Sequence, residues 1–248
     1  MKEKDRMNPA AIDQEAMNLK VTVIVPAYNE VKSIGEILGR VRAQKIENVE
    51  LEVIVVDDAS TDGTREFLEK NPALYDLLLT NPENLGKGGS VKKALARATG
   101  GYVLFQDADL EYDPADYAQL LYPVLNFKAD VVMGSRFLAP KWVRVSYFWH
   151  KIGNLSITFW FNLWNNTTWT DVYSCYLIFR RDLVSPQDLR TTRWQQHAEI
   201  LGTACNRGRR CFEVPISYNG RTYAEGKKIR WYHVVTVLFT IARVKLFS

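Results

Sequence analysis

The chain has 248 residues, of which 47% are hydrophobic and 24% are charged. That length fits one large α/β domain, or such a domain with a small appendage. The formal net charge of +4 is too mild to indicate a nucleic-acid partner. The cysteines, Cys175, Cys205 and Cys211, lack metal-ligand spacing, and their odd number favours reduced thiols in a cytoplasmic protein.

Residues 1–18 are polar, mixed in charge and without an apolar run, so we expect a flexible N-terminal arm and no targeting segment. Beyond this arm, short apolar runs alternate with helical stretches. Predicted strands cover residues 21–25, 51–56, 77–79, 102–106, 131–133 and 175–179. One predicted helix runs from Asn29, as its cap, to Gln44, and two others cover residues 86–99 and 194–205. Two further helices are predicted to begin at residue 60 and at Asp113-Pro114. This alternation predicts an α/β fold with a mostly parallel sheet.

Polar residues follow three of the predicted strands. Tyr28-Asn29-Glu30 comes after the first strand, Asp57-Asp58 after the second and Asp107-Ala108-Asp109 after the fourth. In parallel sheets, ligands bind beyond the carboxyl ends of the strands. The three clusters therefore predict one binding site along that edge.

The acidic cluster at Asp107 and Asp109 predicts a metal site, with Glu111 as a further candidate ligand. Oxygen ligands suit Mg²⁺ or Mn²⁺, which usually keeps several waters and binds substrate phosphate oxygens as well. Such a cation offsets the charge that grows on a departing diphosphate. Because D-x-D alone is a weak motif, the alternative is a solvated loop followed by a helix cap.

Five stretches carry a resemblance to a known family. They are VTVIVPAYNE (21–30), VIVVDDASTDGT (53–64), NLGKGGSVKKAL (84–95), DADLEYDP (107–114) and GSRF (134–137). In this order and spacing the chain resembles the family 2 glycosyltransferases with a GT-A fold, and is most similar to the dolichol- or polyprenyl-phosphate sugar synthases. The resemblance covers about residues 20–230, which implies a Rossmann-like GT-A domain at 19–230 and transfer with inversion at the anomeric carbon.

The resemblance also implies residues that contact the nucleotide-sugar donor. These are Pro26, Tyr28, Glu30, Asp58, Lys87, Asp107, Ala108 and Asp109. Tyr28 would lie near the base, and the Asp58 carboxylate would accept a hydrogen bond from a base N–H. Lys87 would approach the donor from its glycine-rich loop, although this loop could instead simply begin a helix.

On the acceptor side, Asp171 matches the family position for the base that takes a proton from a hydroxyl acceptor. Its alternative role is to organise a loop, and Glu199 is a second candidate base. A lipid phosphate acceptor is already ionised, so the protein would need cations that offset its charge. Arg136 could do so as a catalytic residue. The basic residues predicted to support it at the acceptor phosphate are Arg144, Arg221 and Lys228.

Residues 142–169 contain five of the seven tryptophans, with basic side chains between them. This stretch is too interrupted to span a bilayer, but it is typical of a surface that lies among lipid headgroups. We therefore expect peripheral association with the cytoplasmic face of a membrane, unless the tryptophans pack a core under a long loop. Residues 231–248 predict a C-terminal amphipathic helix.

The segment Ser174-Cys175-Tyr176-Leu177 departs from the family pattern, because it lacks the usual glycine and basic residue. The acceptor therefore stays open between a polyprenyl phosphate and the hydroxyl of a polysaccharide or glycoconjugate. A non-catalytic nucleotide-sugar binding protein is a third hypothesis. A Rossmann dehydrogenase is disfavoured, because no G-x-G-x-x-G follows the first strand. Neither the sugar nor the oligomeric state follows from the sequence.

Overall fold

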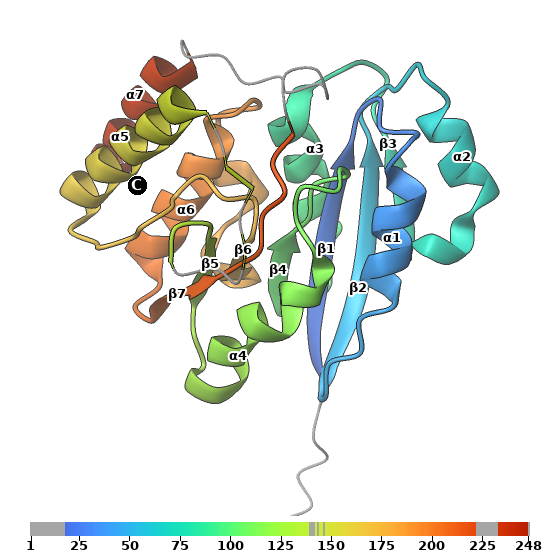
Figure 1. Ribbon diagram of the computed structural model, residues 1–248, viewed down its shortest axis with the longest axis horizontal. Helices are drawn as coiled ribbons and strands as arrows, with labels where there is room; N and C mark the ends of the chain where they lie inside the picture. The colour runs from blue at the N-terminus through green and yellow to red at the C-terminus, as the bar shows by residue number, and fades with distance from the viewer. Residues whose placement is uncertain (1–17, 139–141, 143, 146, 222–232, 248) are drawn as a thin grey trace, which may run out of the picture.

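The structure is a computed structural model that describes residues 18–138, 142, 144–145, 147–221 and 233–247. The described residues form one seven-stranded sheet with the order β3-β2-β1-β4-β6-β5-β7 (Figure 1). The strands are β1 (Leu19–Ala27), β2 (Val49–Asp57), β3 (Leu77–Thr80), β4 (Tyr102–Phe105), β5 (Val131–Ser135), β6 (Leu177–Arg180) and β7 (Cys211–Pro215).

The sheet is mostly parallel, as predicted. Strand β1 runs parallel to β2 and β4, β2 runs parallel to β3, and β5 runs parallel to β7. Strand β6 runs antiparallel to both of its neighbours, β4 and β5. The segment 136–176 therefore leaves the sheet after β5 and re-enters it at the same edge, where the Gly134 amide donates to the Tyr176 carbonyl over 2.8 Å.

Helices cover both faces of the sheet (Figure 1). They are α1 (Ile34–Arg42), α2 (Thr64–Lys70), α3 (Gly86–Leu95), α4 (Tyr117–Phe127), α5 (Phe148–Asn165), α6 (Gln196–Arg207) and α7 (His233–Phe247), with 3-10 turns at Pro72–Leu74, Pro114–Asp116, Arg181–Leu183 and Pro186–Asp188. Helices α1 and α4 cover one face, and α3 and α6 cover the other. Helices α5 and α7 pack against each other on the outer side of α6.

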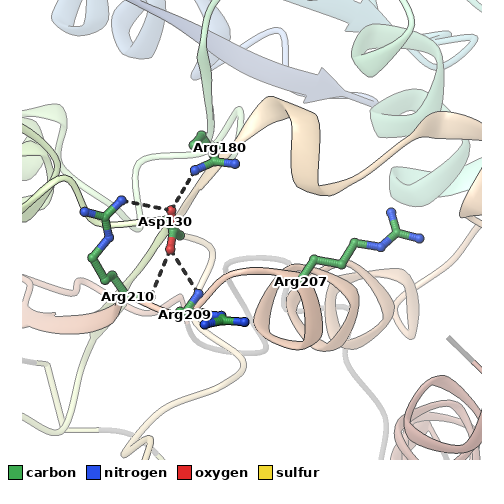
Figure 2. Close-up of a pocket in the computed structure, with 5 residues that line it drawn as sticks. All are labelled: Asp130, Arg180, Arg207, Arg209 and Arg210. Atoms are coloured by element: carbon green, nitrogen blue, oxygen red, sulfur yellow. Dashed lines mark hydrogen bonds and ion pairs between the residues drawn. The ribbon is translucent and has the colours of Figure 1, made fainter.

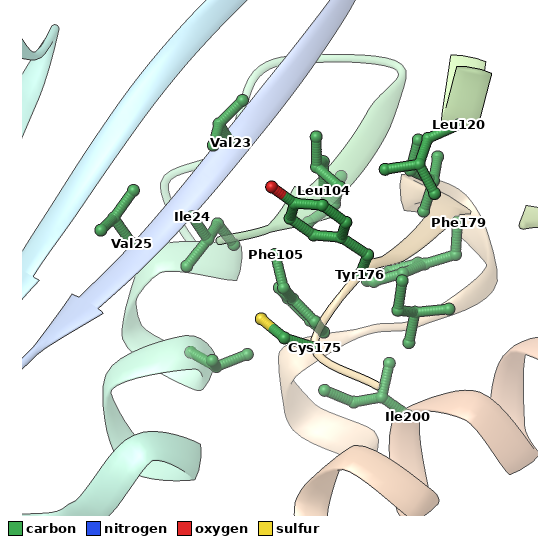
Figure 3. Close-up of a cluster of buried hydrophobic side chains, with 14 of the residues drawn as sticks. Val23, Ile24, Val25, Leu104, Phe105, Leu120, Cys175, Tyr176, Phe179 and Ile200 are labelled. Atoms are coloured by element: carbon green, nitrogen blue, oxygen red, sulfur yellow. The ribbon is translucent and has the colours of Figure 1, made fainter. Parts of the chain in front are cut away.

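The core lies between the central strands and the helix layers. Side chains of β1 and β4 meet Tyr176 and Phe179, from the β6 region, and Ile200 from α6 (Figure 3). Burying a large apolar side chain stabilises a fold by about 1.5–3 kcal/mol. The strand ends that carry the polar clusters therefore project from a rigid, close-packed base.

Several predicted boundaries are wrong. Helix α1 begins at Ile34 with Ser33 at its N-cap, so Asn29 does not cap it. Asn29 instead adopts a left-handed conformation with φ of 55°, and its side-chain oxygen accepts a hydrogen bond from the Thr61 amide over 2.8 Å. Helix α3 ends at Leu95, earlier than predicted, and β7 was not predicted.

Some predictions concern segments outside the described residues. These include nearly all of the predicted N-terminal arm, the basic residue Lys228 and the beginning of the predicted C-terminal segment. Within that last segment, α7 covers His233–Phe247. Val237, Thr240, Ile241 and Val244 of this helix are buried, whereas Phe239 and Leu246 are exposed.

Candidate active site

The three polar clusters leave the sheet at one edge. In the sheet register, Ala27 at the end of β1 lies beside Asp57 at the end of β2. Ile24 of β1 lies beside Phe105 at the end of β4, so the residues that follow β4 emerge next to β1. The structure thus brings Tyr28, Asp58 and Asp107 to the same edge of the sheet, as the sequence predicts.

Asp58 is buried and ties the end of β2 to the loop that begins α3. Its carboxylate accepts hydrogen bonds from the Asn81 side chain (2.6 Å) and from the amides of Leu85 (2.9 Å) and Gly86 (2.8 Å). Gly86 has φ of +79°, a conformation that favours glycine. These bonds fix the start of the helix that carries Lys87.

Asp57, beside Asp58, has a property that the sequence did not reveal. Its side chain is fully buried, and one of its carboxylate oxygens has no hydrogen-bond partner among the described residues. Buried polar atoms are rarely left unpaired in folded proteins, because their desolvation is costly. This oxygen lies beneath the edge of the sheet and is not exposed to a ligand in the structure.

Lys87 forms an ion pair with Asp107, and its Nζ lies 3.8 Å from the Cys175 Sγ. Burial alone would raise the pKa of Asp107, but the charge of Lys87 lowers it below its ordinary value. Burial alone would lower the pKa of Lys87, but the charge of Asp107 raises this pKa above its usual range. Both groups are therefore charged near neutral pH.

Cys175 and His197 are additions to the predicted site. Burial, and then the charge of Asp107, raise the pKa of the Cys175 thiol well above its usual value. Burial, and then the charge of Lys87, lower the pKa of His197 to about 3, so its imidazole is neutral. No spacing in the sequence places Cys175 beside Lys87, because the two residues come from distant segments that the fold brings together.

Asp109 is buried next to a second positive group. The Arg221 guanidinium lies 2.5 Å from the Asp109 carboxylate, 3.2 Å from that of Glu111 and 3.4 Å from that of Glu30. Burial, and then the charges of Asp107 and Glu111, raise the pKa of Asp109 to about 7. The structure thus places Arg221 among the donor-side carboxylates, whereas the sequence assigned it to the acceptor phosphate.

Asp107 and Asp109 fit a hard divalent cation. Asp109 is buried and Asp107 half-buried, a cation would relieve the repulsion between their charges, and their oxygens are the ligands that Mg²⁺ and Mn²⁺ prefer. Glu111 already accepts hydrogen bonds from the Tyr218 hydroxyl (3.0 Å) and the Arg221 amide (2.8 Å), so it positions that loop. Across the described residues, no group of three or more acidic, histidine or cysteine side chains is arranged to hold a metal.

The predicted acceptor residues Arg136 and Asp171 form a buried ion pair. The guanidinium donates to both carboxylate oxygens, over 2.7 and 2.8 Å, and the Arg136 amide donates to one of them over 3.1 Å. The Asp171 amide donates to the Glu213 carboxylate over 3.0 Å, and the centre of the Tyr218 ring lies 5.0 Å from the Arg136 guanidinium. Both oxygens of Asp171 are therefore directed at Arg136.

Glu199, the second candidate base, connects α6 to its surroundings. Its carboxylate accepts hydrogen bonds from the amides of Arg190 (3.1 Å) and Thr191 (2.9 Å) and from the Arg243 guanidinium of α7 (2.5 Å). These contacts hold a loop and α7 against α6. Arg144 is exposed, and its amide donates to the Tyr218 carbonyl over 3.0 Å.

Helices α5 and α7 expose an unusually apolar surface. We call it the apolar face of α5 and α7; it consists of Phe148, Trp149, Ile152, Leu155, Phe159, Trp160, Leu163, Trp164, Phe239 and Leu246. Trp149 is 77% exposed and Phe239 is 71% exposed, whereas Trp169 is buried. The alternative that these tryptophans form a core is therefore wrong, apart from Trp169. None of the helices in the described part of the chain has the length and apolarity needed to span a membrane.

Residues 22–185 match the family described as Glycosyl transferase family 2. The chain belongs to this family. This family 2 glycosyltransferase is 28% identical to the UDP-N-acetylglucosamine–dolichyl-phosphate N-acetylglucosaminyltransferase of Methanococcus voltae, over 84% of the chain and 90% of that relative. It is 28% identical to the low-salt glycan biosynthesis hexosyltransferase Agl6 of Haloferax volcanii, over 86% of the chain and 52% of Agl6. These relatives agree with the resemblance that the sequence motifs indicated.

Two solved structures support the GT-A fold of this family 2 glycosyltransferase. Glucosyl-3-phosphoglycerate synthase of Mycobacterium tuberculosis, in complex with Mn²⁺, UDP and glucosyl-3-phosphoglycerate, superposes with a TM-score of 0.67 at 17% identity, over 98% of the chain and 87% of that structure. TarS 1–349 of S. aureus, in complex with UDP-GlcNAc, gives a TM-score of 0.59 at 20% identity, over 90% of the chain and 66% of TarS 1–349. The predicted fold is confirmed, and the family uses nucleotide-sugar donors.

Proposed function

We propose that this glycosyltransferase transfers a sugar, with inversion, from its nucleotide donor to a polyprenyl-type lipid phosphate at a membrane surface. The observation that carries the proposal is the Arg136–Asp171 pair. A hydroxyl acceptor needs a carboxylate free to take its proton, but both oxygens of Asp171 accept hydrogen bonds from Arg136. A phosphate acceptor needs no such base, and a guanidinium suits it.

In the proposed reaction, an ionised oxygen of the acceptor phosphate attacks the anomeric carbon. A new carbon–oxygen bond forms as the bond to the nucleoside diphosphate breaks, and no proton has to be removed from the acceptor. Asp107 and Asp109 would hold a divalent cation, which supplies positive charge to the departing diphosphate. Lys87 would add positive charge beside Asp107, and Arg136 would offset the charge of the acceptor phosphate.

The apolar face of α5 and α7 supports the membrane part of the proposal. Monomeric soluble proteins rarely expose large contiguous apolar patches, and aromatic side chains favour the boundary between lipid and water. The name of the Methanococcus voltae relative supports a dolichyl-type phosphate acceptor. The complexes of the structural neighbours with UDP-GlcNAc, or with UDP and Mn²⁺, support the donor and metal assignments.

The test is a transfer assay with a panel of radiolabelled nucleotide sugars and three acceptors: a polyprenyl phosphate, the corresponding polyprenol, and free sugars. We expect label in the lipid fraction only with the polyprenyl phosphate and only with Mg²⁺ or Mn²⁺ present. Transfer to free sugars or to the polyprenol alone would refute the phosphate acceptor. Full turnover in excess chelator would refute the metal assignment and leave the acceptor result interpretable.

A further inference from the structure

An open hollow of about 430 Å³ lies away from the donor edge of the sheet. It is lined by Asp130, Arg180, Arg207, Arg209 and Arg210 (Figure 2). Asp130 and Arg210 immediately precede β5 and β7, whose other ends lead into the acceptor-side segments. At about 3.3 Å per residue, these five-residue strands separate the hollow from the donor edge by roughly 16 Å. We call it the arginine hollow.

Asp130 holds the walls of the arginine hollow in place. Its carboxylate accepts hydrogen bonds from Arg180 (3.0 Å) and from the amides of Arg209 and Arg210 (3.0 Å each). Burial would raise the pKa of Asp130, but the two amide bonds lower it below its ordinary value. Asp130 is thus ionised, and its oxygens are already used to position the arginines.

The guanidinium groups are unequally paired. Arg180 also binds Asp182 over 2.7 and 2.8 Å, and Arg207 binds Asp188 over 2.6 Å. Arg210 reaches Asp130 only at 3.6 Å, and its side chain is half exposed. The Arg209 guanidinium has no hydrogen bond or ion pair within the described part of the chain. Four guanidinium groups thus face three carboxylates, and two of them keep most of their donors free.

From this arrangement we propose that the arginine hollow is a binding site for a phosphate group, separate from the donor and acceptor sites. Guanidinium groups present paired N–H donors that match phosphate oxygens, and several of them around one hollow favour an anion of more than one charge. The hollow is large enough for a pyrophosphate or a small phosphate ester. The proposal does not depend on which acceptor the enzyme uses.

The phosphate group could belong to a soluble anion or to an anionic lipid headgroup. The end of α7 lies close to the hollow, because Lys245 donates to the Asn206 side chain over 3.3 Å, one residue before Arg207. Leu246, next to Lys245, belongs to the apolar face of α5 and α7. The end of α7 is therefore held against α6 one residue before a lining arginine, and the experiment must distinguish the two sources.

The first arm of the experiment titrates pyrophosphate into the 248-residue protein by calorimetry, with a chelator present so that no metal occupies the donor site. Wild type is compared with Arg209→Gln/Arg210→Gln and with Arg65→Gln/Lys70→Gln, which removes the same charge from α2. We expect the hollow variant to bind at least about tenfold more weakly, since one charge-assisted hydrogen bond is worth about that factor. The α2 variant should bind like wild type.

The second arm measures co-sedimentation with vesicles of phosphatidylcholine alone or mixed with phosphatidylglycerol. Phosphatidylglycerol-dependent binding that is lost in the hollow variant and kept in the α2 variant supports the site with a lipid source. The proposal is overturned if wild type binds neither probe, if the hollow variant binds like wild type, or if both variants lose binding equally. Thermal melts verify folding, and Arg209→Gln alone carries the test should the double variant unfold, because this side chain has no partner to lose among the described residues.

Discussion

The donor half of the molecule, around Asp58 and Asp107, and the acceptor half, which carries α5 and α7, differ in the side chains that they expose. At the donor edge, acidic and basic side chains are mostly half-buried and paired with one another, as in the Lys87–Asp107 pair and the contacts of Arg221 with Asp109. On the acceptor side, α5 and α7 leave large aromatic side chains in contact with solvent. A prearranged charge site suits a small, highly charged donor, whereas an exposed apolar face suits a partner that brings its own apolar surface.

The largest expected effect follows from removing a charge at the donor edge. Asp109→Asn should lower kcat by a factor of about 10² to 10³, because the proposed metal site loses a charged ligand. Its melting temperature above pH 7, measured in chelator, should not fall. Because the pKa of Asp109 is raised to about 7, its ionised form is unfavourable in the folded state. Glu47→Gln, an exposed change on the α1–β2 connection, serves as the matched control; unchanged turnover in Asp109→Asn would contradict the metal assignment.

The second prediction concerns the buried Arg136–Asp171 pair on the acceptor side. Arg136→Gln should lower the free energy of unfolding by about 3–5 kcal/mol, because it leaves the buried Asp171 carboxylate without its partner. Arg136→Gln/Asp171→Asn should recover most of that loss. Urea unfolding measures both, with the exposed Arg97→Gln as control. If the two single losses simply add in the double variant, the residues do not act as a pair.

The third prediction tests the exposed face directly. Trp149→Ser should weaken binding to neutral phosphatidylcholine vesicles by about tenfold, since an inserted aromatic side chain contributes about 1.5–3 kcal/mol. Stability should change by less than about 0.5 kcal/mol, because this side chain is mostly exposed. Tyr122→Ser, which alters an exposed aromatic residue on α4, should bind like wild type. Equal binding by all three proteins would remove the membrane role of the apolar face.

The smallest effect is expected from Glu52, which lies in the first half of β2, away from the donor edge. Burial would raise the pKa of Glu52, but hydrogen bonds from Thr22 and Thr99 lower it to about 2. Because the folded pKa is lower than the unfolded value, Glu52 stabilises the fold above about pH 4.5, and this contribution is lost as the pH falls towards 2. Glu52→Gln should therefore flatten the acid side of the stability profile. An unchanged acid transition would contradict this role for Glu52.

The donor half was largely predictable from the sequence because its strands are continuous β-branched runs. Such runs place the following residues at one edge of the sheet, so the Asp58 and Asp107 clusters could be brought together without coordinates. The prediction that Asn29 caps α1 was wrong, because the Asn29 side chain instead accepts a hydrogen bond from the Thr61 amide. The proximity of Cys175 to Lys87 was not predictable, since it depends on tertiary packing between distant segments.

The acceptor half was less predictable for a similar reason. Thr192, in the loop before α6, packs so closely on Gly88 of α3 that a Cβ added to Gly88 would lie 2.5 Å from the Thr192 carbonyl carbon, and no local pattern signals this contact. Strand β7 is short and partly exposed, so it lacks a strong apolar run. The partners of Glu199, the second candidate base, were not predictable, because they come from a loop and from α7.

The reversed direction of β6 has a consequence for how such enzymes diversify. The segment 136–176 has both of its ends pinned to one edge, where Met133 pairs with Leu177 and the Gly134 amide bonds to the Tyr176 carbonyl. The stretch between Arg136 and Asp171 can therefore change in length and composition without shifting the register of any other strand, whereas Cys175, near the end of the segment, lies beside Lys87 of the donor site. A related chain could replace this stretch with another and acquire a new acceptor while its donor-binding residues stay the same.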